Sequence, residues 1–206
     1  MWRAVVVLLS AGIIAPLFCQ SPAPGSGASK ATAAPTLPYL DWGACPFEGC
    51  TYREWTASKA VVVYDTWEEK RQPIARLSVG EKVTATTGVV ITFRPGVIRM
   101  DRDRPENGLR SGDTISVYTN LGEGYAKVWF KGRFYSEFDI TFAAWPDHTA
   151  CGDAKCVAAF TDVGKSAWWA QVKLSSGRMG WVEMGSGDFD GVDQLAGRPH
   201  LTAAGA

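Results

Sequence analysis

The sequence predicts an all-β protein that consists of one or two small barrels. Short segments rich in Val, Ile, Thr and aromatic residues follow a period of two, which is typical of half-buried strands. Turns that contain Gly or Pro separate them at short intervals, for example at 94–96, 106–108 and 121–124. No segment after the N-terminus keeps a helical period, because Pro73 interrupts the one charged stretch at 68–77. Many short strands without helices indicate a barrel or a sandwich.

Each expected strand owes its assignment to β-branched and aromatic residues. In chain order, the expected strands are residues 60–67, 81–86, 89–93, 113–119, 126–130 and 167–174. The chain has 206 residues, of which 46% are hydrophobic and 20% are charged, so it can bury one sizeable core or two small ones. Its 21 basic residues balance 21 acidic ones. This balance gives no electrostatic attraction for nucleic acid, so we expect no nucleic-acid partner.

The N-terminus has the features of an export signal. Residues 1–20 hold one positive charge, Arg3, and then an apolar run of signal-peptide length, so we expect an exported protein, periplasmic or extracellular. Cys19 offers an alternative, a lipid-anchored protein, although the bulky Phe18 before it disfavours lipidation. Membrane contact is expected only through one of these two routes. Residues 21–38, rich in Ser, Ala, Pro and Gly, form an expected disordered linker, and 196–206 an expected disordered tail.

Two hairpin-like segments share a pattern. Residues 125–135 (YAKVWFKGRFY) and 169–181 (WAQVKLSSGRMGW) both begin with an aromatic residue, Ala, Lys or Gln, and Val, and both continue through a Gly-Arg turn to an aromatic residue. Two hairpins with the same inward positions indicate either two tandem small barrels or one elaborated barrel.

The turn and hairpin motifs resemble those of the bacterial SH3-like (SH3b-type) domain. The matching segments are LSVGEKV at 77–83, LRSGDTISV at 109–117 and WAQVKLSSGRMGWV at 169–182. The resemblance implies SH3-like β modules at 39–108 and 109–195. It also implies that Trp181 and Val172 belong to the core. The usual early Arg-rich strand is absent, since VVVYDTWEE stands in its place.

Aromatic residues are the candidates for a binding surface. Strand alternation places Trp168 and Trp169 on opposite faces. The resemblance implies a binding module of the bacterial cell envelope that recognises a peptide or a peptidoglycan component over exposed aromatics. The expected ligand-binding residues are Trp168, Tyr118, Tyr125 and Trp129. The alternative is a structural or assembly protein of the envelope without a small ligand, in which these rings are covered.

The cysteines form two pairs with the same spacing. Cys45 and Cys50 enclose four residues, as do Cys151 and Cys156, and in an exported protein this pattern favours two local disulfides. Bridges between the pairs and a structural zinc site of all four cysteines are the alternatives. We expect no cofactor and no enzymatic activity, because neither His148 nor any other residue belongs to a recognisable catalytic motif.

Overall fold

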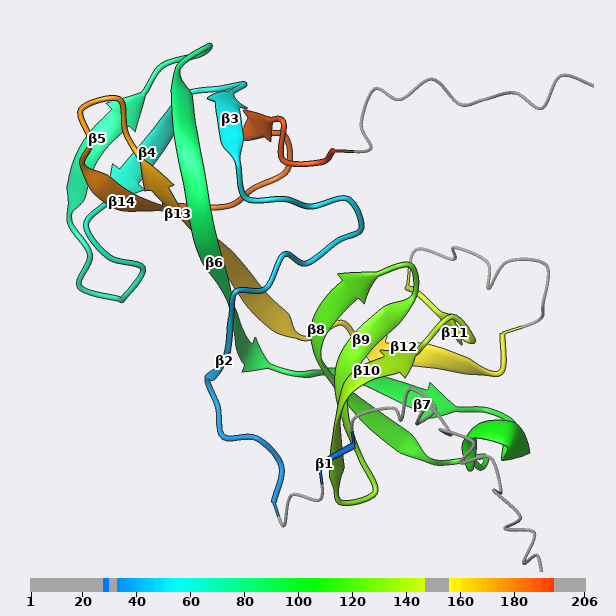
Figure 1. The fold of residues 1–206 in the computed structure, drawn as a ribbon. Helices are drawn as coiled ribbons and strands as arrows, with labels where there is room; N and C mark the ends of the chain where they lie inside the picture. Colours follow the sequence, from blue (N-terminus) through cyan, green and yellow to red (C-terminus); the bar gives the residue numbers. More distant parts are fainter. Residues whose placement is uncertain (1–27, 30–32, 147–155, 195–206) are drawn as a thin grey trace, which may run out of the picture.

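A computed structural model describes residues 28–29, 33–146 and 156–194 of the chain. Within these residues the strands form two curled sheets, one of eight strands and one of seven, and the only helix is a short 3₁₀ turn, η1 (Pro105–Asn107). Figure 1 shows the two sheets as separate lobes, one above the other. The all-β prediction is confirmed.

The larger sheet is called the β6 sheet after its longest strand. Its strands are β2 (Tyr39–Trp42), β3 (Glu54–Ala57), β4 (Val61–Tyr64), β5 (Pro73–Leu77), β6 (Lys82–Arg94), β13 (Lys165–Lys173), β14 (Met179–Glu183) and β15 (Phe189–Asp190). The strand order is β15-β3-β6-β13-β14-β4-β5, and β2 also pairs with β6. Its core contains Trp55, Leu77, Val172 and Val182, all at most 1% exposed.

The second sheet is called the β8 sheet. Its strands are β1 (Ala28–Ser29), β7 (Gly96–Met100), β8 (Thr114–Gly122), β9 (Tyr125–Phe130), β10 (Arg133–Asp139), β11 (Ala143–Ala144) and β12 (Ala158–Asp162), in the order β1-β10-β9-β8-β7-β12-β11. Ile98, Ile115 and Val128 lie in its separate core. Two residues of the expected linker, Ala28 and Ser29, thus pair with β10 as an edge strand.

One antiparallel ribbon runs through both sheets. Strand β6 continues through Pro95 into β7, and β12 continues through Val163 and Gly164 into β13. Because β6 pairs with β13 and β7 pairs with β12, the same two chain segments stay together across the junction. There Arg94 forms an ion pair with Asp162, and the Gly164 amide donates to Asp162 Oδ1 at 2.8 Å.

The sheets are nested rather than consecutive. Residues 96–162 supply all the strands of the β8 sheet except β1, and they lie between β6 and β13 of the other sheet. Each sheet therefore contains strands from both of the expected modules, 39–108 and 109–195, so a boundary after residue 108 does not separate them. The pairing of β6 with β13 joins segments about seventy residues apart, and the local sequence pattern carries no signal for it.

The repeated turn motif has the same geometry in both sheets. In each copy a buried leucine, Leu77 or Leu109, precedes a glycine with positive φ and then an acidic residue. The carboxylate of Glu81 accepts from the Ser78 amide at 3.0 Å, and that of Asp113 accepts from the Arg110 amide at 2.8 Å. The acidic residue thus satisfies a backbone donor within the turn that leads into β6 or β8.

The repeated hairpin also has equivalent core positions. Ala126 and Val128 of β9 correspond to Ala170 and Val172 of β13, and all four side chains are fully buried. In both sheets three strands follow one another by antiparallel pairing, β8-β9-β10 in one and β6-β13-β14 in the other. Trp181 of β14 is buried as well. The two copies of the pattern are therefore two structural repeats.

We expect Gly164→Ala to destabilise the fold because two backbones meet at this residue. Its φ is +77°, and a Cβ would lie 2.6 Å from Arg94 O and Gly96 N. Gly112 has φ +84° but open space around it, so Gly112→Ala is the matched control. In urea unfolding, the free energy of unfolding should fall by about 3 kcal/mol for Gly164→Ala and by about 1 kcal/mol for Gly112→Ala. Equal losses would show that the junction tolerates a side chain.

Candidate binding groove

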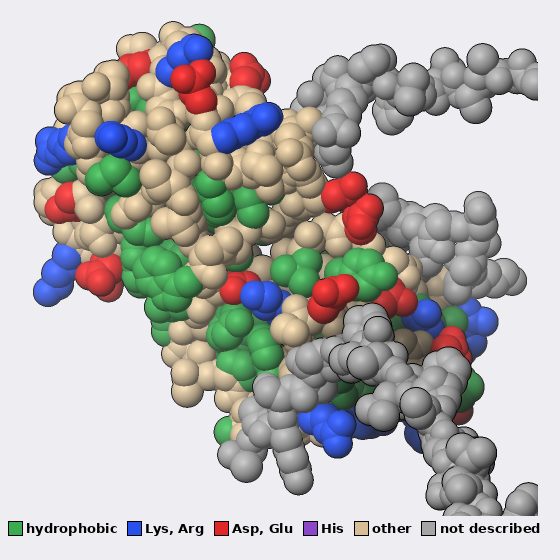
Figure 2. Space-filling view, in the orientation of Figure 1, with side chains coloured by type: hydrophobic (Ala, Val, Ile, Leu, Met, Phe, Trp, Pro, Cys, Tyr) green, Lys and Arg blue, Asp and Glu red, His purple; other side chains and the backbone are tan. Residues whose placement is uncertain are grey.

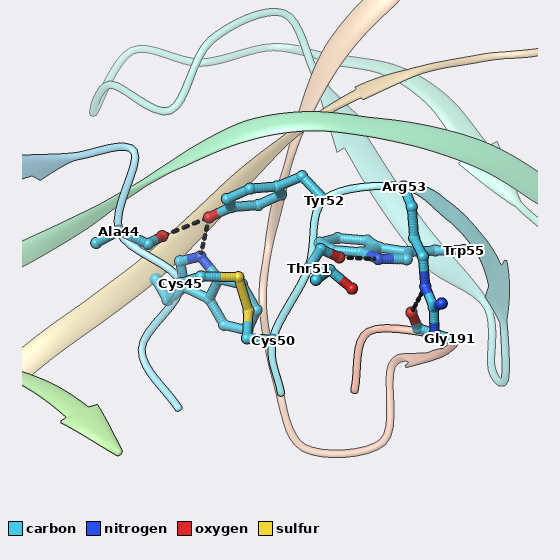
Figure 3. Close-up of a disulfide and its surroundings, with 9 residues drawn as sticks. Ala44, Cys45, Cys50, Thr51, Tyr52, Arg53, Trp55 and Gly191 are labelled. Atoms are coloured by element: carbon cyan, nitrogen blue, oxygen red, sulfur yellow. Dashed lines mark hydrogen bonds between the residues drawn. A yellow bond between two sulfur atoms is a disulfide. The ribbon is translucent and has the colours of Figure 1, made fainter. Parts of the chain in front are cut away.

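A disulfide closes a loop beside the junction of the two sheets. Cys45 and Cys50 are bonded, with their Cα atoms 5.5 Å apart, as the spacing predicted. This loop, residues 45–50, is called the disulfide loop. In Figure 3 the Tyr52 ring lies beside it, with its hydroxyl directed at the carbonyl oxygen of Ala44, to which it donates a hydrogen bond. The same hydroxyl accepts from the Trp168 indole N–H at 3.1 Å.

The second cysteine pair is only partly described. Cys156 takes part in a disulfide, whereas Cys151 lies outside the described residues, so the local pairing of these two stays a prediction. The alternative zinc site of four cysteines is wrong for the first pair, because sulfurs bonded to each other are not available as thiolate ligands.

Trp168 is the centre of an aromatic cluster on β13. Its neighbour Trp169 is 2% exposed and points to the opposite face of the sheet, as alternation predicted. The Trp168 ring is half-buried, 5.9 Å from Phe47 and 6.3 Å from Trp55, and both contacts are edge-on. Because Trp168 is only partly buried, part of its side chain stays accessible at the surface.

A groove is lined in part by Trp168. It has a volume of about 540 Å³ between the disulfide loop and the segment that follows β14. Phe47 and Trp168 form one wall, and residues 184–193 form the other. The segment is fixed to the β6 sheet, since Arg53 Nε donates to Gly191 O at 2.8 Å and the Thr51 amide donates to Val192 O at 2.9 Å. The groove is therefore held open by the fold itself.

Trp168 also lines a second space, a cleft between the two sheets. It has a volume of about 150 Å³, and Figure 2 shows a hollow between the sheets with hydrophobic side chains beside it. The cleft is lined by Trp168 and Val90 of the β6 sheet, by Tyr118 of the β8 sheet and by Trp145, which follows β11. Pro46 of the disulfide loop also lines it. Trp168 lines both the groove and the cleft, and the consecutive loop residues Pro46 and Phe47 line the cleft and the groove, respectively. The two spaces are therefore adjacent. Together, the groove and the cleft are called the track.

Polar contacts hold the sheets together around the cleft. Lys127 of β9 forms an ion pair with the buried Asp41 of β2 at 2.7 Å, and Thr92 of β6 donates to Tyr118 O at 2.5 Å. Burial, with the nearby charge of Asp41, raises the pKa of Tyr39 to about 12, so its phenol stays neutral between the sheets. The Thr119 hydroxyl in the cleft wall is buried without a hydrogen-bond partner among the described residues.

The structure brings together two of the four predicted ligand-binding residues. Trp168 and the largely buried Tyr118 line the cleft from opposite sheets. Tyr125 and Trp129 lie on the face of β9 away from the core, together with Lys127, and line neither the cleft nor the groove. Tyr125 is 39% exposed and Trp129 is half-buried.

Sequence reasoning missed several aromatic residues of the molecule. Phe47 and Trp145 belong to the track, and a Pro-Phe pair inside a short disulfide loop was the available signal for the first. Trp42 of β2 is 55% exposed and lies edge-on against Trp67 at 5.7 Å and Trp181 at 6.2 Å. These three tryptophans form a second aromatic surface, on the face of the β6 sheet opposite to Trp168.

The described residues contain neither a group of metal-ligating side chains nor a helix that is long and apolar enough to cross a membrane. His148, the signal segment 1–20 and the tail 196–206 lie outside the described residues. Comparisons with protein-family models, curated proteins and solved structures found no match to this chain. The SH3-like resemblance therefore stays a prediction.

The disulfide loop touches the β8 sheet at the turn between β8 and β9. The two backbones meet closely, since a Cβ on Gly122 would lie 2.4 Å from the Glu48 amide nitrogen. Glu48 faces Glu123 of this turn, and the charge of Glu123 raises the pKa of Glu48, with smaller contributions from desolvation, a side-chain hydrogen bond to Glu123 and the charge of Asp193. Two carboxylates therefore repel each other at the point where the loop reaches the other sheet.

We expect Glu123→Gln to lower the pKa of Glu48 toward its ordinary value, because the substitution removes the repelling charge. Carboxyl titration by NMR measures this, and Glu137→Gln on β10 is the control. A raised native pKa contributes stability below the ordinary carboxyl pKa, and this contribution is lost as pH rises through the raised value. The part of the pH dependence of urea unfolding that comes from Glu48 should shrink in Glu123→Gln. An unchanged Glu48 titration would contradict the assigned cause.

Proposed function

We propose that this protein is an exported, non-catalytic binding module of the cell envelope that recognises an extended peptide, such as a peptidoglycan stem or a segment of an envelope protein. The peptide lies along the track and crosses the face of Trp168. The observation that carries the proposal is the half-buried Trp168, which borders both the groove and the cleft. The Cys45–Cys50 disulfide is consistent with export, since such bonds persist in oxidising compartments.

The shape of the track supports a peptide ligand. The groove volume of about 540 Å³ falls in the range typical of ligand sites, whereas the cleft, at about 150 Å³, suits a single side chain. Grooves lined by aromatic residues are common where extended peptides bind. The walls are preformed, because the disulfide and the contacts of residues 184–193 fix them. A preformed site loses little conformational entropy when the ligand binds.

A second candidate function is assembly with another envelope protein through the aromatic surface around Trp42. Its support is the 55% exposure of the Trp42 side chain, together with the adjoining Trp67. Figure 2 shows hydrophobic side chains gathered on the visible face beside the turn between β4 and β5. Exposed apolar patches of this kind mark interaction surfaces in soluble domains. The two candidates are separable, because the Trp42 surface and the track lie on opposite faces of the β6 sheet.

We expect Phe47→Ala to weaken binding to soluble peptidoglycan fragments and envelope peptides about tenfold, because it removes one aromatic wall of the groove. Trp168→Phe should have a similar effect while keeping the packing on Trp55. Tyr125→Ala, which lines neither the groove nor the cleft, is the matched control and should bind like the unaltered protein. Isothermal titration calorimetry measures the affinities, and circular dichroism confirms the fold.

A different set of results would favour the second candidate. Retention of an envelope protein that is lost in Trp42→Ala but kept in Phe47→Ala would move the function to the Trp42 surface. Peptide affinities that are identical in all the track variants would contradict the proposal.

A further inference from the structure

The two parts of the track carry charged residues of opposite sign. The residues that line the groove include Asp188, Asp190 and Asp193 but no Lys or Arg. The residues that line the cleft include Arg94 and Lys165 but no Asp or Glu. Trp168 lies at the boundary between an acidic half and a basic half. A ligand that fills both halves meets opposite fields at its two ends.

In the acidic half, the charge of one aspartate is balanced by an ion pair within the protein, whereas another aspartate forms no ion pair with a described residue. Asp188 is buried, forms an ion pair with Lys59 at 2.5 Å and accepts from the Gly185 amide at 2.6 Å, so its charge is taken up within the protein. Asp190 is exposed and forms no ion pair with any described residue. Its carboxylate is therefore available to a ligand.

The disulfide loop adds negative charge at the edge of the groove. Glu48 follows Phe47 directly and faces Glu123 of the β8–β9 turn. A cation near this pair would relieve the repulsion between the two carboxylates. The rings of Phe47 and Trp168 form the adjacent wall, and aromatic faces attract cations as well. The acidic half thus favours a positively charged group beside an aromatic ring.

In the basic half, one cationic side chain is likewise paired within the protein and the other is not. Arg94 forms an ion pair with Asp162 across the ribbon. The Lys165 ammonium lies 5.7 Å from the Phe93 ring and forms no ion pair with any described carboxylate. Lys165 stands three residues before Trp168 on the same strand, which is about 10 Å along β13. Its charge is therefore open to an anionic group that lies beyond the Trp168 ring.

We infer that the ligand is an extended peptide bound in one polarity, with a positively charged side chain or amine beside Asp190 in the groove and a carboxylate near Lys165 at the cleft. This inference rests on the proposed function and specifies its ligand. The centre of such a peptide is apolar, since it crosses Trp168 and Phe47. Exposed charge pairs add little affinity each, so their main effect is on the direction of binding and on selectivity.

Selection from a library of short random peptides on the full chain tests the inference. We expect enriched peptides to carry a basic residue and an acidic residue on opposite sides of an apolar centre. Synthetic versions of the enriched peptides are then measured by calorimetry. Asp190→Lys should weaken binding about fivefold, and so should Lys165→Glu, because each replaces an attraction with a repulsion. Glu69→Lys, in the exposed β4–β5 turn, is the control for net charge and should leave the affinity unchanged.

Reversal of the peptide charge makes the test specific. A peptide in which the basic residue is replaced by Glu should bind Asp190→Lys better than it binds the unaltered protein. Enriched peptides without a charge pattern, whose binding still depends on Phe47, would overturn the polarity but keep the proposed function. No enrichment over the Phe47→Ala variant would overturn both.

Discussion

Antiparallel pairing of β6 with β13, continued by β7 with β12, is the constraint on which both sheets depend. Neither sheet is complete without this ribbon, because β6 and β13 are central in one sheet and β7 and β12 belong to the other. The two partners are about seventy residues apart, so bringing them together costs loop-closure entropy. The β8 sheet offsets this cost, since its own core brings the two ends of the intervening segment to one place. Gly164 then lets the strands cross at backbone contact distance.

The disulfide loop connects this framework to the candidate binding site. A six-residue loop gains only about 2 kcal/mol from its crosslink, so the bond matters more for position than for stability. It holds Pro46 beside the cleft and Phe47 against Trp168, and it meets the β8 sheet at Gly122. The aromatic wall is thus fixed to both sheets. A loop without the crosslink would have to be ordered by the ligand, at a cost in affinity.

Local sequence patterns predicted the fold class and the repeats, because both depend on residue patterns within short segments. Period-two alternation identified the strands, and the shared positions of the two hairpins are the buried Ala126, Ala170, Val128 and Val172. The nesting was not predictable, since the order of strands in a sheet depends on pairings between distant segments. The candidate site was predicted only in part for the same reason. Trp168 was identified from its strand, but its meeting with Tyr118 of the other sheet depends on the nesting.

The nested arrangement also accounts for the position of the groove. In the β8 sheet, β8 returns to β9 through Glu123 and Gly124, a two-residue turn in which both residues have positive φ. Tyr125 corresponds to Trp169 in the two repeats. Gly124, the residue before Tyr125, therefore corresponds to Trp168, the residue before Trp169. A side chain there is excluded, because a Cβ on Gly124 would lie 2.2 Å from the Thr141 methyl group.

In the β6 sheet the inserted residues 96–162 replace that tight turn, and β13 begins four residues before Trp169. The extra length allows a tryptophan where the other repeat requires glycine. It also places this ring at the junction, between a groove formed by the β6 sheet and a cleft formed with the inserted sheet. The insertion therefore both builds the second sheet and makes room for Trp168 at the junction. The proposed binding surface is a consequence of this topology rather than an addition to it.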